Sequence, residues 1–256
     1  MNQYSSFARV YDAFMEDVPY KKWCGMIVDE LKKENITDGL LLDLGCGTGT
    51  FTRMLSGAGY DMIGVDGSQE MLMEAREKDA DGDILYLCQD IREFELYGTV
   101  RAVISTCDTM NYLLTPEDFV QTVRLVNNYL DPGGLFLFDL NTLYKFRELM
   151  GNATFAESGA DAAFIWDNYF DGESGCNEYD LTLFLKREDG LFERHVEVHR
   201  EQGYTPQEVR RFLAEGGMEF VRMFDGETGG APGETSEKIF FIAREKGKLK
   251  GSTSGK

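Results

Sequence analysis

The stretch LLDLGCGTGT at residues 41–50 constrains the fold of this chain more than any other segment. A short apolar run is followed directly by glycines at positions 45, 47 and 49. Glycines at this point are typical of a tight turn from a buried strand into a helix, where the backbone can approach a nucleotide closely. Their spacing is G-x-G-x-G, whereas dinucleotide folds use G-x-G-x-x-G and would need glycine in place of Thr50. The loop therefore predicts a ligand other than a dinucleotide.

The residues around this loop alternate between short apolar segments and amphipathic segments. Ser68 can cap one expected helix, and Thr115 with Pro116 can begin another. This βαβα order is typical of a parallel sheet covered by helices on both faces, so the fold class is predicted as α/β with a Rossmann-like doubly wound sheet. Strands are expected at residues 40–44, 61–66, 84–90, 101–107 and 133–140, and helices at 50–59, 69–80 and 117–130.

The pattern changes after residue 141 to consecutive β-like segments. Residues 162–170, 178–188 and 191–199 are separated by the turn-forming sequences DGESGCN and DG, which predicts an antiparallel β insertion. A helix at 204–217, begun by a capping box of Thr205 and Glu208, precedes two closing strands. These closing strands are expected at residues 218–224 and 238–244.

Composition excludes several classes of partner. The net charge of -19 opposes binding to nucleic acid, and the lysine-containing end of the chain is expected to be a disordered tail. No signal peptide begins the sequence, and no apolar run reaches the roughly 18 residues of a membrane span. Five scattered cysteines without a C-x-x-C pair suggest neither disulfides nor a metal site. A cytoplasmic protein with no nucleic-acid or membrane partner, monomeric or homodimeric, is expected.

Two carboxylates near the glycine loop narrow the ligand further. Asp66, at the end of the second strand, is placed to accept hydrogen bonds from both hydroxyls of a ribose, and Asp43 can face an ammonium group. Together the motifs DLGCGTGT, VDGSQEML and CQDIREF resemble the class I S-adenosylmethionine-dependent methyltransferases of small-molecule type. The resemblance spans roughly residues 40–140 and the closing strands. It implies a seven-stranded sheet whose last strand, KIFFIAR, is antiparallel.

The resemblance assigns roles to individual residues of the cofactor site. The glycine loop would line the methionine and ribose, and Asp66 would hold the ribose. Asp90 and Ile91 would flank the adenine, and Cys107 would lie beside the methionine part. The expected cofactor-binding residues are Tyr4, Tyr11, Asp43, Gly45, Cys46, Gly47, Gly49, Asp66, Gly67, Met71, Asp90, Ile91 and Cys107.

The first 36 residues are rich in aromatic side chains. An aromatic stripe at helical spacing is more often part of a core than of a ligand site. The resemblance favours a lid instead, because similar small-molecule methyltransferases cover the cofactor with an N-terminal aromatic helix. Tyr4 and Tyr11 could present hydroxyls to the cofactor carboxylate or ring faces to its sulfonium, with Tyr11 preferred.

The segment CDTMNYL follows the fourth strand, where carboxyl ends of parallel strands form the ligand crevice. Asn111 and Tyr112 are candidates for the methyl-transfer site, although Tyr112 could equally anchor the next helix. Asp139 and Asn141, at the end of the fifth strand, are likewise candidates for the methyl-transfer site that could equally have a structural role. The N/D-P-P-Y signature of enzymes that methylate bases in nucleic acids is absent.

The two histidines of the chain lie in RHVEVHRE, where His195, Glu197 and His199 alternate onto one face of a strand. A metal site is conceivable from this spacing. We expect instead a solvated polar face with Val196 and Val198 packed inward, since no further ligand is evident. His199 is retained as a candidate general base or substrate contact.

These observations predict transfer of a methyl group from S-adenosylmethionine to nitrogen or oxygen of a small molecule. Two alternatives stay open: a cofactor-binding module without turnover, and an NAD(P)-dependent oxidoreductase. The expected organisation is a helical lid (1–36), a cofactor-binding core (37–145), a substrate-covering insertion (146–203), closing elements of the core (204–246) and a disordered tail (247–256).

Overall fold

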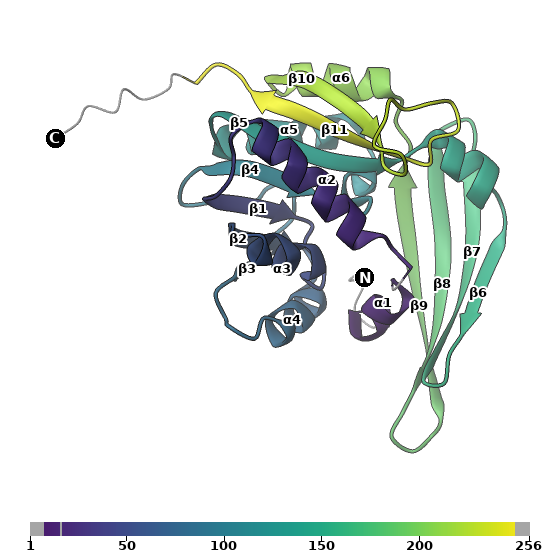
Figure 1. Ribbon diagram of the computed structural model, residues 1–256. Helices are drawn as coiled ribbons and strands as arrows, with labels where there is room; N and C mark the ends of the chain where they lie inside the picture. Colours follow the sequence, from purple (N-terminus) through teal and green to yellow (C-terminus); the bar gives the residue numbers. More distant parts are fainter. Residues whose placement is uncertain (1–7, 16, 249–256) are drawn as a thin grey trace.

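A computed structural model describes residues 8–15 and 17–248. The protein consists of a seven-stranded sheet with helices on both faces, and a second sheet of long strands that stands beside it (Figure 1). The strand order of the large sheet is β10-β11-β5-β4-β1-β2-β3. Its strands are β1 (Leu40–Leu44), β2 (Asp61–Asp66), β3 (Leu85–Cys88), β4 (Val100–Ser105), β5 (Leu130–Asn141), β10 (Met218–Asp225) and β11 (Lys238–Glu245).

Strand directions in this sheet follow the expected arrangement. Strands β1 to β5 pair in parallel, whereas β11 runs antiparallel to both β5 and β10. The prediction of a Rossmann-like seven-stranded sheet with an antiparallel last strand is therefore confirmed. Parallel strands end at one edge of a sheet, so the loops after β1, β2 and β4 meet there.

Helices cover the two faces of the large sheet. Apolar residues of α2 and α3 pack on one face around Leu41 and Ile104, and those of α5 and α6 pack on the other around Phe138 and Phe241. The predicted caps Ser68 and Thr115 are confirmed. The helices are α1 (Ala8–Phe14), α2 (Tyr20–Lys33), α3 (Thr50–Gly57), α4 (Gln69–Lys78), α5 (Pro116–Tyr129) and α6 (Pro206–Glu215). Among the described residues, no helix is long and apolar enough to cross a membrane.

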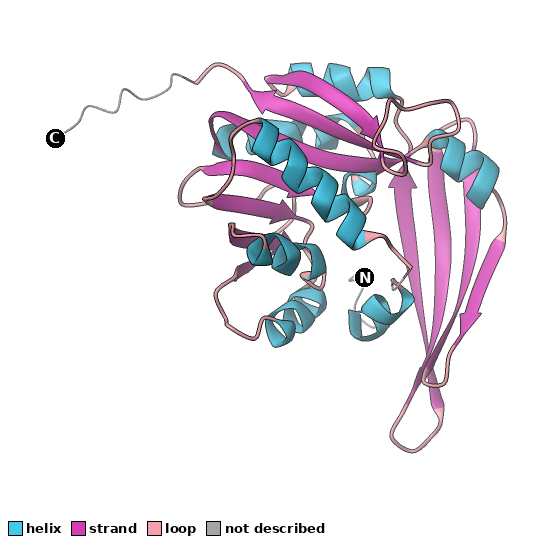
Figure 2. Ribbon diagram, viewed as in Figure 1, coloured by secondary structure: helices cyan, strands magenta, loops and turns pink. Residues whose placement is uncertain are grey.

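The second sheet has the order β6-β7-β8-β9 and is antiparallel throughout. The sequence predicted three of these strands and missed β6, whose residues are all exposed and therefore carry no alternating apolar pattern. Phe14 of α1 packs edge-on against Phe164 of this sheet at a centroid distance of 4.8 Å. Figure 2 shows α1 between the helices of the large sheet and the second sheet. The strands are β6 (Thr154–Ser158), β7 (Ala162–Asp171), β8 (Cys176–Lys186) and β9 (Phe192–Gln202).

Candidate functional site

A cavity of about 1400 Å³ lies where the carboxyl ends of β1, β2 and β4 meet α1 and β9. It is large enough for a ligand of drug size and a second small molecule. Of the residues expected to bind a cofactor, eleven line this cavity: Tyr11, Asp43, Gly45, Cys46, Gly47, Asp66, Gly67, Met71, Asp90, Ile91 and Cys107. Tyr4 lies outside the described residues.

The glycine loop has a backbone that only glycine adopts easily. Gly45, Gly47 and Gly49 have φ of 81°, 52° and 71°. A Cβ on Gly47 would meet no atom within 4 Å, so this residue faces open cavity space, whereas one on Gly49 would lie 2.6 Å from the hydroxyl of Tyr86. Gly49 does not line the cavity, which corrects the expectation for this residue. Its glycine is required by packing against Tyr86.

Asp66 ties the glycine loop to the start of α4. One carboxylate oxygen accepts a hydrogen bond from the N–H of Gly47 and the other from the N–H of Ser68, both at 2.8 Å. Burial raises the pKa of Asp66, and the two N–H groups oppose this rise by stabilising the charged form. The carboxylate is thus held rigidly on the cavity wall.

Asp43 lies deeper, at the end of β1, and is almost wholly buried. Its carboxylate accepts a hydrogen bond from the hydroxyl of Thr52 at 2.6 Å. Burial raises the pKa of Asp43 to about 7, against the effect of this hydrogen bond, and the nearby charge of Asp66 adds to the rise. A cationic ligand in the cavity would favour the ionised form of both groups.

Asp90 and Ile91 lie at the end of the cavity next to β3. Arg92 donates to the carboxylate of Asp90 from its backbone N–H at 2.8 Å and from Nε at 2.9 Å. These bonds lower the pKa of Asp90 despite partial burial. The carboxylate is therefore fixed and charged, with Ile91 beside it as an apolar surface.

Helix α1 is attached directly to the glycine loop. Asp12 accepts a hydrogen bond from the hydroxyl of Thr48 at 2.6 Å. It also forms an ion pair with Lys78 of α4 at 3.0 Å. Tyr11 and Tyr20 line the cavity. Trp23, by contrast, packs in the core against Phe240. The N-terminal aromatic residues thus serve partly as cavity wall and partly as core.

The opposite end of the cavity is formed by aromatic and acidic side chains. The hydroxyl of Tyr112 lies 3.1 Å from Nδ1 of His199 and 3.0 Å from the hydroxyl of Tyr179. Nε2 of His199 is 3.4 Å from a carboxylate oxygen of Glu197. Tyr112 and Glu197 line the cavity, whereas His199 is completely buried behind them.

This arrangement overturns the expected orientation of β9. Val196 and Val198 are 44% and 45% exposed, while Glu197 and His199 are buried. The polar face of the strand is the inward one because it packs against Tyr112 and the rings of β8, where Tyr179 stacks on His199 at 4.7 Å. His199 is not on a solvated face.

Asn111 is a second correction. Its side chain is fully buried and absent from the cavity wall. Nδ2 donates to the backbone oxygens of Asn141 and Gln202, and Oδ1 accepts from the N–H of Asn141 at 2.9 Å. These bonds tie the large sheet to β9, so the amide of Asn111 holds the structure together and does not face the cavity.

Several wall residues were not predicted. Thr106 and Thr109 flank Cys107, and Glu197 belongs to a strand whose facing was misjudged. Their proximity to the expected residues in the sequence was the only signal that could have found the threonines. The other unpredicted wall residues are Tyr20, Thr48, Thr50, Phe51, Ser68, Arg92, Leu113, Leu114, Val196, Val198 and Arg200.

Comparison with known proteins agrees with this geometry. The methyltransferase domain family matches residues 41–134. A putative methyltransferase of Geobacillus sp. (strain WCH70) is 33% identical over 94% of this chain and 99% of its own length, and the putative methyltransferase YqeM of Bacillus subtilis is 32% identical over 94% and 97%. A solved S-adenosylmethionine-dependent methyltransferase from Clostridium acetobutylicum has a TM-score of 0.84 at 28% identity, covering 95% of this chain and 99% of that one.

The wall residues fit the cofactor of these proteins. S-adenosylmethionine carries a positive sulfonium and an ammonium group, and the cavity wall contributes the carboxylates of Asp43, Asp66 and Asp90. Gly47 and Gly67 leave room beside them, since a Cβ on either would meet no protein atom within 4 Å. Sequence similarity along almost the whole chain and the site agree, and they exclude the oxidoreductase alternative. The chain belongs to the S-adenosylmethionine-dependent methyltransferases.

Proposed function

We propose that this protein methylates a nitrogen atom of a small basic amine in the cytoplasm. The single observation that supports this choice is the buried carboxylate of Glu197 on the wall of the cavity that also contains the glycine loop. A carboxylate on the cavity wall, beside the imidazole of His199, favours an acceptor that carries a positive charge over a neutral one. Hydroxyl acceptors carry no such charge.

The cofactor half of the cavity would be held by residues already described. Asp66 would accept from the ribose, Asp90 and Ile91 would flank the adenine, and the glycine loop would line the methionine part. When bound, S-adenosylmethionine supplies an electrophilic methyl group. The protein's contribution is mainly alignment, since holding two reactants in line can supply most of the acceleration.

The acceptor half would bind the amine as a cation and hold the proton that the nitrogen gives up. Tyr11, Tyr20 and Tyr112 offer ring faces and hydroxyls to a positive group. The nitrogen lone pair becomes available once the proton leaves, and Glu197 with His199 behind it can hold this proton. Tyr112 would orient His199 through its hydroxyl.

A relative of narrower coverage supports nitrogen as the acceptor atom. The dTDP-3-amino-3,4,6-trideoxy-alpha-D-glucopyranose N,N-dimethyltransferase of Streptomyces venezuelae is 30% identical over 52% of this chain and 56% of its own length. The aligned part is about half of either protein. It supports an amine acceptor and leaves the particular amine open.

The test is an activity screen with matched libraries of small amines and alcohols, read by formation of S-adenosylhomocysteine. Amines alone should be methylated. Glu197→Gln should lower kcat/KM for the best amine by about 10²-fold or more, the usual scale for a group that moves a proton, while affinity for S-adenosylhomocysteine is unchanged in calorimetry. Glu193→Gln, the same substitution at an exposed position of β9, is the control.

Three results would contradict parts of the proposal. Methylation of alcohols alone would move the acceptor to oxygen. An unchanged rate in Glu197→Gln would remove this carboxylate from the acceptor site. Tight binding of S-adenosylhomocysteine without turnover on any acceptor would favour the module that only binds cofactor.

A further inference from the structure

Two consecutive residues at the end of β4 have an unusual backbone. Cys107 and Asp108 have φ of 57° and 63°, in the left-handed region that residues with a side chain rarely adopt. Such a conformation is unfavourable for a residue with a side chain. Two such residues in a row persist only when contacts with the surrounding structure hold them.

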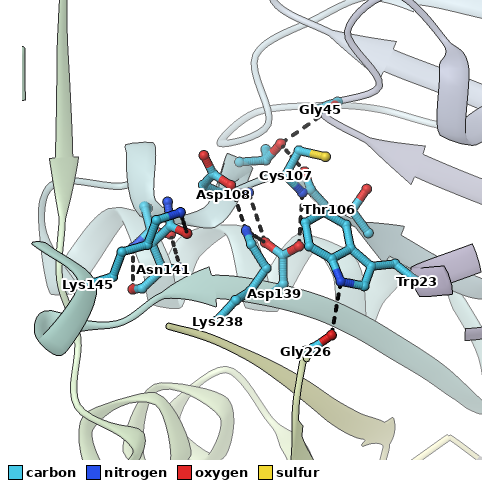
Figure 3. Close-up of polar contacts among 12 residues, drawn as sticks. Trp23, Gly45, Thr106, Cys107, Asp108, Asp139, Asn141, Lys145, Gly226 and Lys238 are labelled. Carbon is cyan, nitrogen blue, oxygen red and sulfur yellow. Dashed lines mark hydrogen bonds and ion pairs between the residues drawn. The ribbon is translucent and has the colours of Figure 1, made fainter. Parts of the chain in front are cut away.

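The turn is held by the carboxylate of Asp139, near the end of β5. Oδ2 of Asp139 accepts from the N–H of Cys107 at 3.0 Å, and Oδ1 accepts from the N–H of Asp108 at 2.8 Å. Nζ of Lys238, at the start of β11, lies 2.7 Å from Oδ1 of Asp108 and 3.2 Å from Oδ1 of Asp139. Figure 3 shows Lys238 pointing toward both carboxylates while Asp139 reaches the turn.

Asp139 and Lys238 are buried and Asp108 is partly exposed, and the charge of each group depends on the others. Desolvation opposes ionisation of Asp108, but Lys238 and Lys145 outweigh it and lower its pKa. Burial likewise disfavours the charged Lys238, and the two carboxylates outweigh it and raise its pKa. A buried ion pair of this kind contributes little net stability compared with apolar packing. Its contribution lies instead in the backbone groups that it holds in place.

The turn forms part of the cavity wall. Thr106, Cys107 and Thr109 line the cavity, whereas Asp139 and Lys238 do not. The hydroxyl of Thr109 donates to the backbone oxygen of Thr106 at 3.0 Å. Thr109 also packs closely against Gly45: a Cβ on Gly45 would lie 2.2 Å from the methyl group of Thr109. A shift of the turn would therefore be transmitted to the glycine loop.

We infer that Asp139 and Lys238 are positioning residues for methyl transfer: they hold the Cys107–Asp108 turn in its left-handed conformation and so fix the wall between cofactor and acceptor. The inference rests on the activity of the methyltransferase family and not on the identity of the acceptor. It assigns a function to charged residues that do not line the cavity.

The test uses Asp139→Asn, which removes the charge and turns one acceptor into a donor facing an N–H group. We expect kcat to fall by about 10²-fold, the scale of a 1 Å misalignment of reacting groups, with a smaller change in the affinity for S-adenosylhomocysteine. Asp131→Asn, at an outer position of the same strand, is the matched control.

A double-mutant cycle separates positioning from core stability. Cys107→Gly permits a positive φ without strain, whereas Cys107→Ala removes the thiol equally but keeps the strain. The kcat of Cys107→Gly divided by that of Cys107→Ala measures how much relief of strain helps the reaction. This ratio should be at least about tenfold larger when Asp139 is replaced by Asn than when Asp139 is present, and the difference is the coupling between the two positions. Any methyltransferase reaction on a detected acceptor can serve as the assay.

The outcomes are distinct. Equal Gly-to-Ala ratios in the two backgrounds, or a normal kcat in Asp139→Asn, would overturn the inference. If Asp139→Asn does not fold, Lys238→Gln, which removes only the ammonium group, replaces it in the same double-mutant cycle. Failure of both variants to fold would also overturn it, because the network would then be a requirement of the core.

Discussion

Glu201 of β9 is a buried carboxyl whose protonation should make the stability of the protein depend on pH. It is 2% exposed, and Oε2 has no hydrogen-bond partner among the described residues. Burial raises its pKa from 4.5 to about 8, and the charge of Asp108 adds to the rise. Lys145, Lys238 and a hydrogen bond with Asn141 act in the opposite direction without cancelling it. Glu201 is therefore protonated in the folded protein at neutral pH.

The sign of the effect follows from proton binding. Between pH 4.5 and about 8 the folded protein binds more protons at Glu201 than the unfolded chain does. Its contribution to the free energy of unfolding is thus fully present below pH 4.5, falls as pH rises through this window, and is lost above about pH 8. At 1.36 kcal/mol per pH unit, the full loss is about 5 kcal/mol.

Glu201→Gln tests this reasoning, because glutamine resembles the protonated acid and does not titrate. We expect the variant to match the parent in stability near pH 4.5 and to exceed it by about 3–5 kcal/mol near pH 8. Urea unfolding at pH 4.5 and at each pH unit from 5 to 8 gives both free energies. Subtracting the curves cancels titrating groups that do not interact with Glu201, such as Asp43.

Glu193→Gln, at an exposed position of β9, controls for removal of a carboxylate. Its curve shows how much of any difference comes from removing a carboxylate from this strand. A pH-independent difference between Glu201→Gln and the parent, or one that favours the parent as pH rises, would refute the argument that the carboxyl of Glu201 is buried and protonated.

Other substitutions test the cofactor site. Gly45→Ala should weaken binding of S-adenosylhomocysteine at least about tenfold, because its Cβ would lie 2.2 Å from Thr109 at a φ of 81°, whereas Gly57→Ala, at an open position, should not. Asp66→Ala should weaken this binding by about 1.5–3 kcal/mol in calorimetry, and an unchanged affinity in a folded variant would place Asp66 outside the site. Asp12→Ala should speed hydrogen exchange of α1 in the cofactor complex; equal exchange would show that the bonds of Asp12 do not hold this helix against the glycine loop.

The core of the fold could be predicted because its signals are local. Apolar runs of strand length, the cap at Ser68 and the capping box of Thr205 and Glu208 each depend on neighbours in sequence, and the structure confirms both caps. The position of Asp66 at the end of β2 follows from the same local pattern. The glycine loop needed only its spacing.

The contacts between distant segments could not be predicted in this way. Asn111 has the composition expected of a site residue, yet its amide satisfies backbone groups of Asn141 and Gln202, which follow it by 30 and 91 positions. Asp139 likewise reaches the turn after β4 only because β4 and β5 are neighbours in the sheet. Which polar groups a fold satisfies internally is a property of its tertiary contacts.

The prediction of which face of β9 points inward was wrong for a different reason, which is the nature of the groups that the strand packs against. An alternating strand is normally oriented with its apolar residues inward, and this rule placed Val196 and Val198 in the core. The rule assumes that the inside is apolar. Here the inner side of β9 packs against polar and aromatic groups, among them Tyr112 and the charges around Asp108, so Glu197, His199 and Glu201 are buried and the valines are exposed. Burial of three ionisable side chains on one strand is costly, and a sequence that retains them in alternation points to a site beneath the strand.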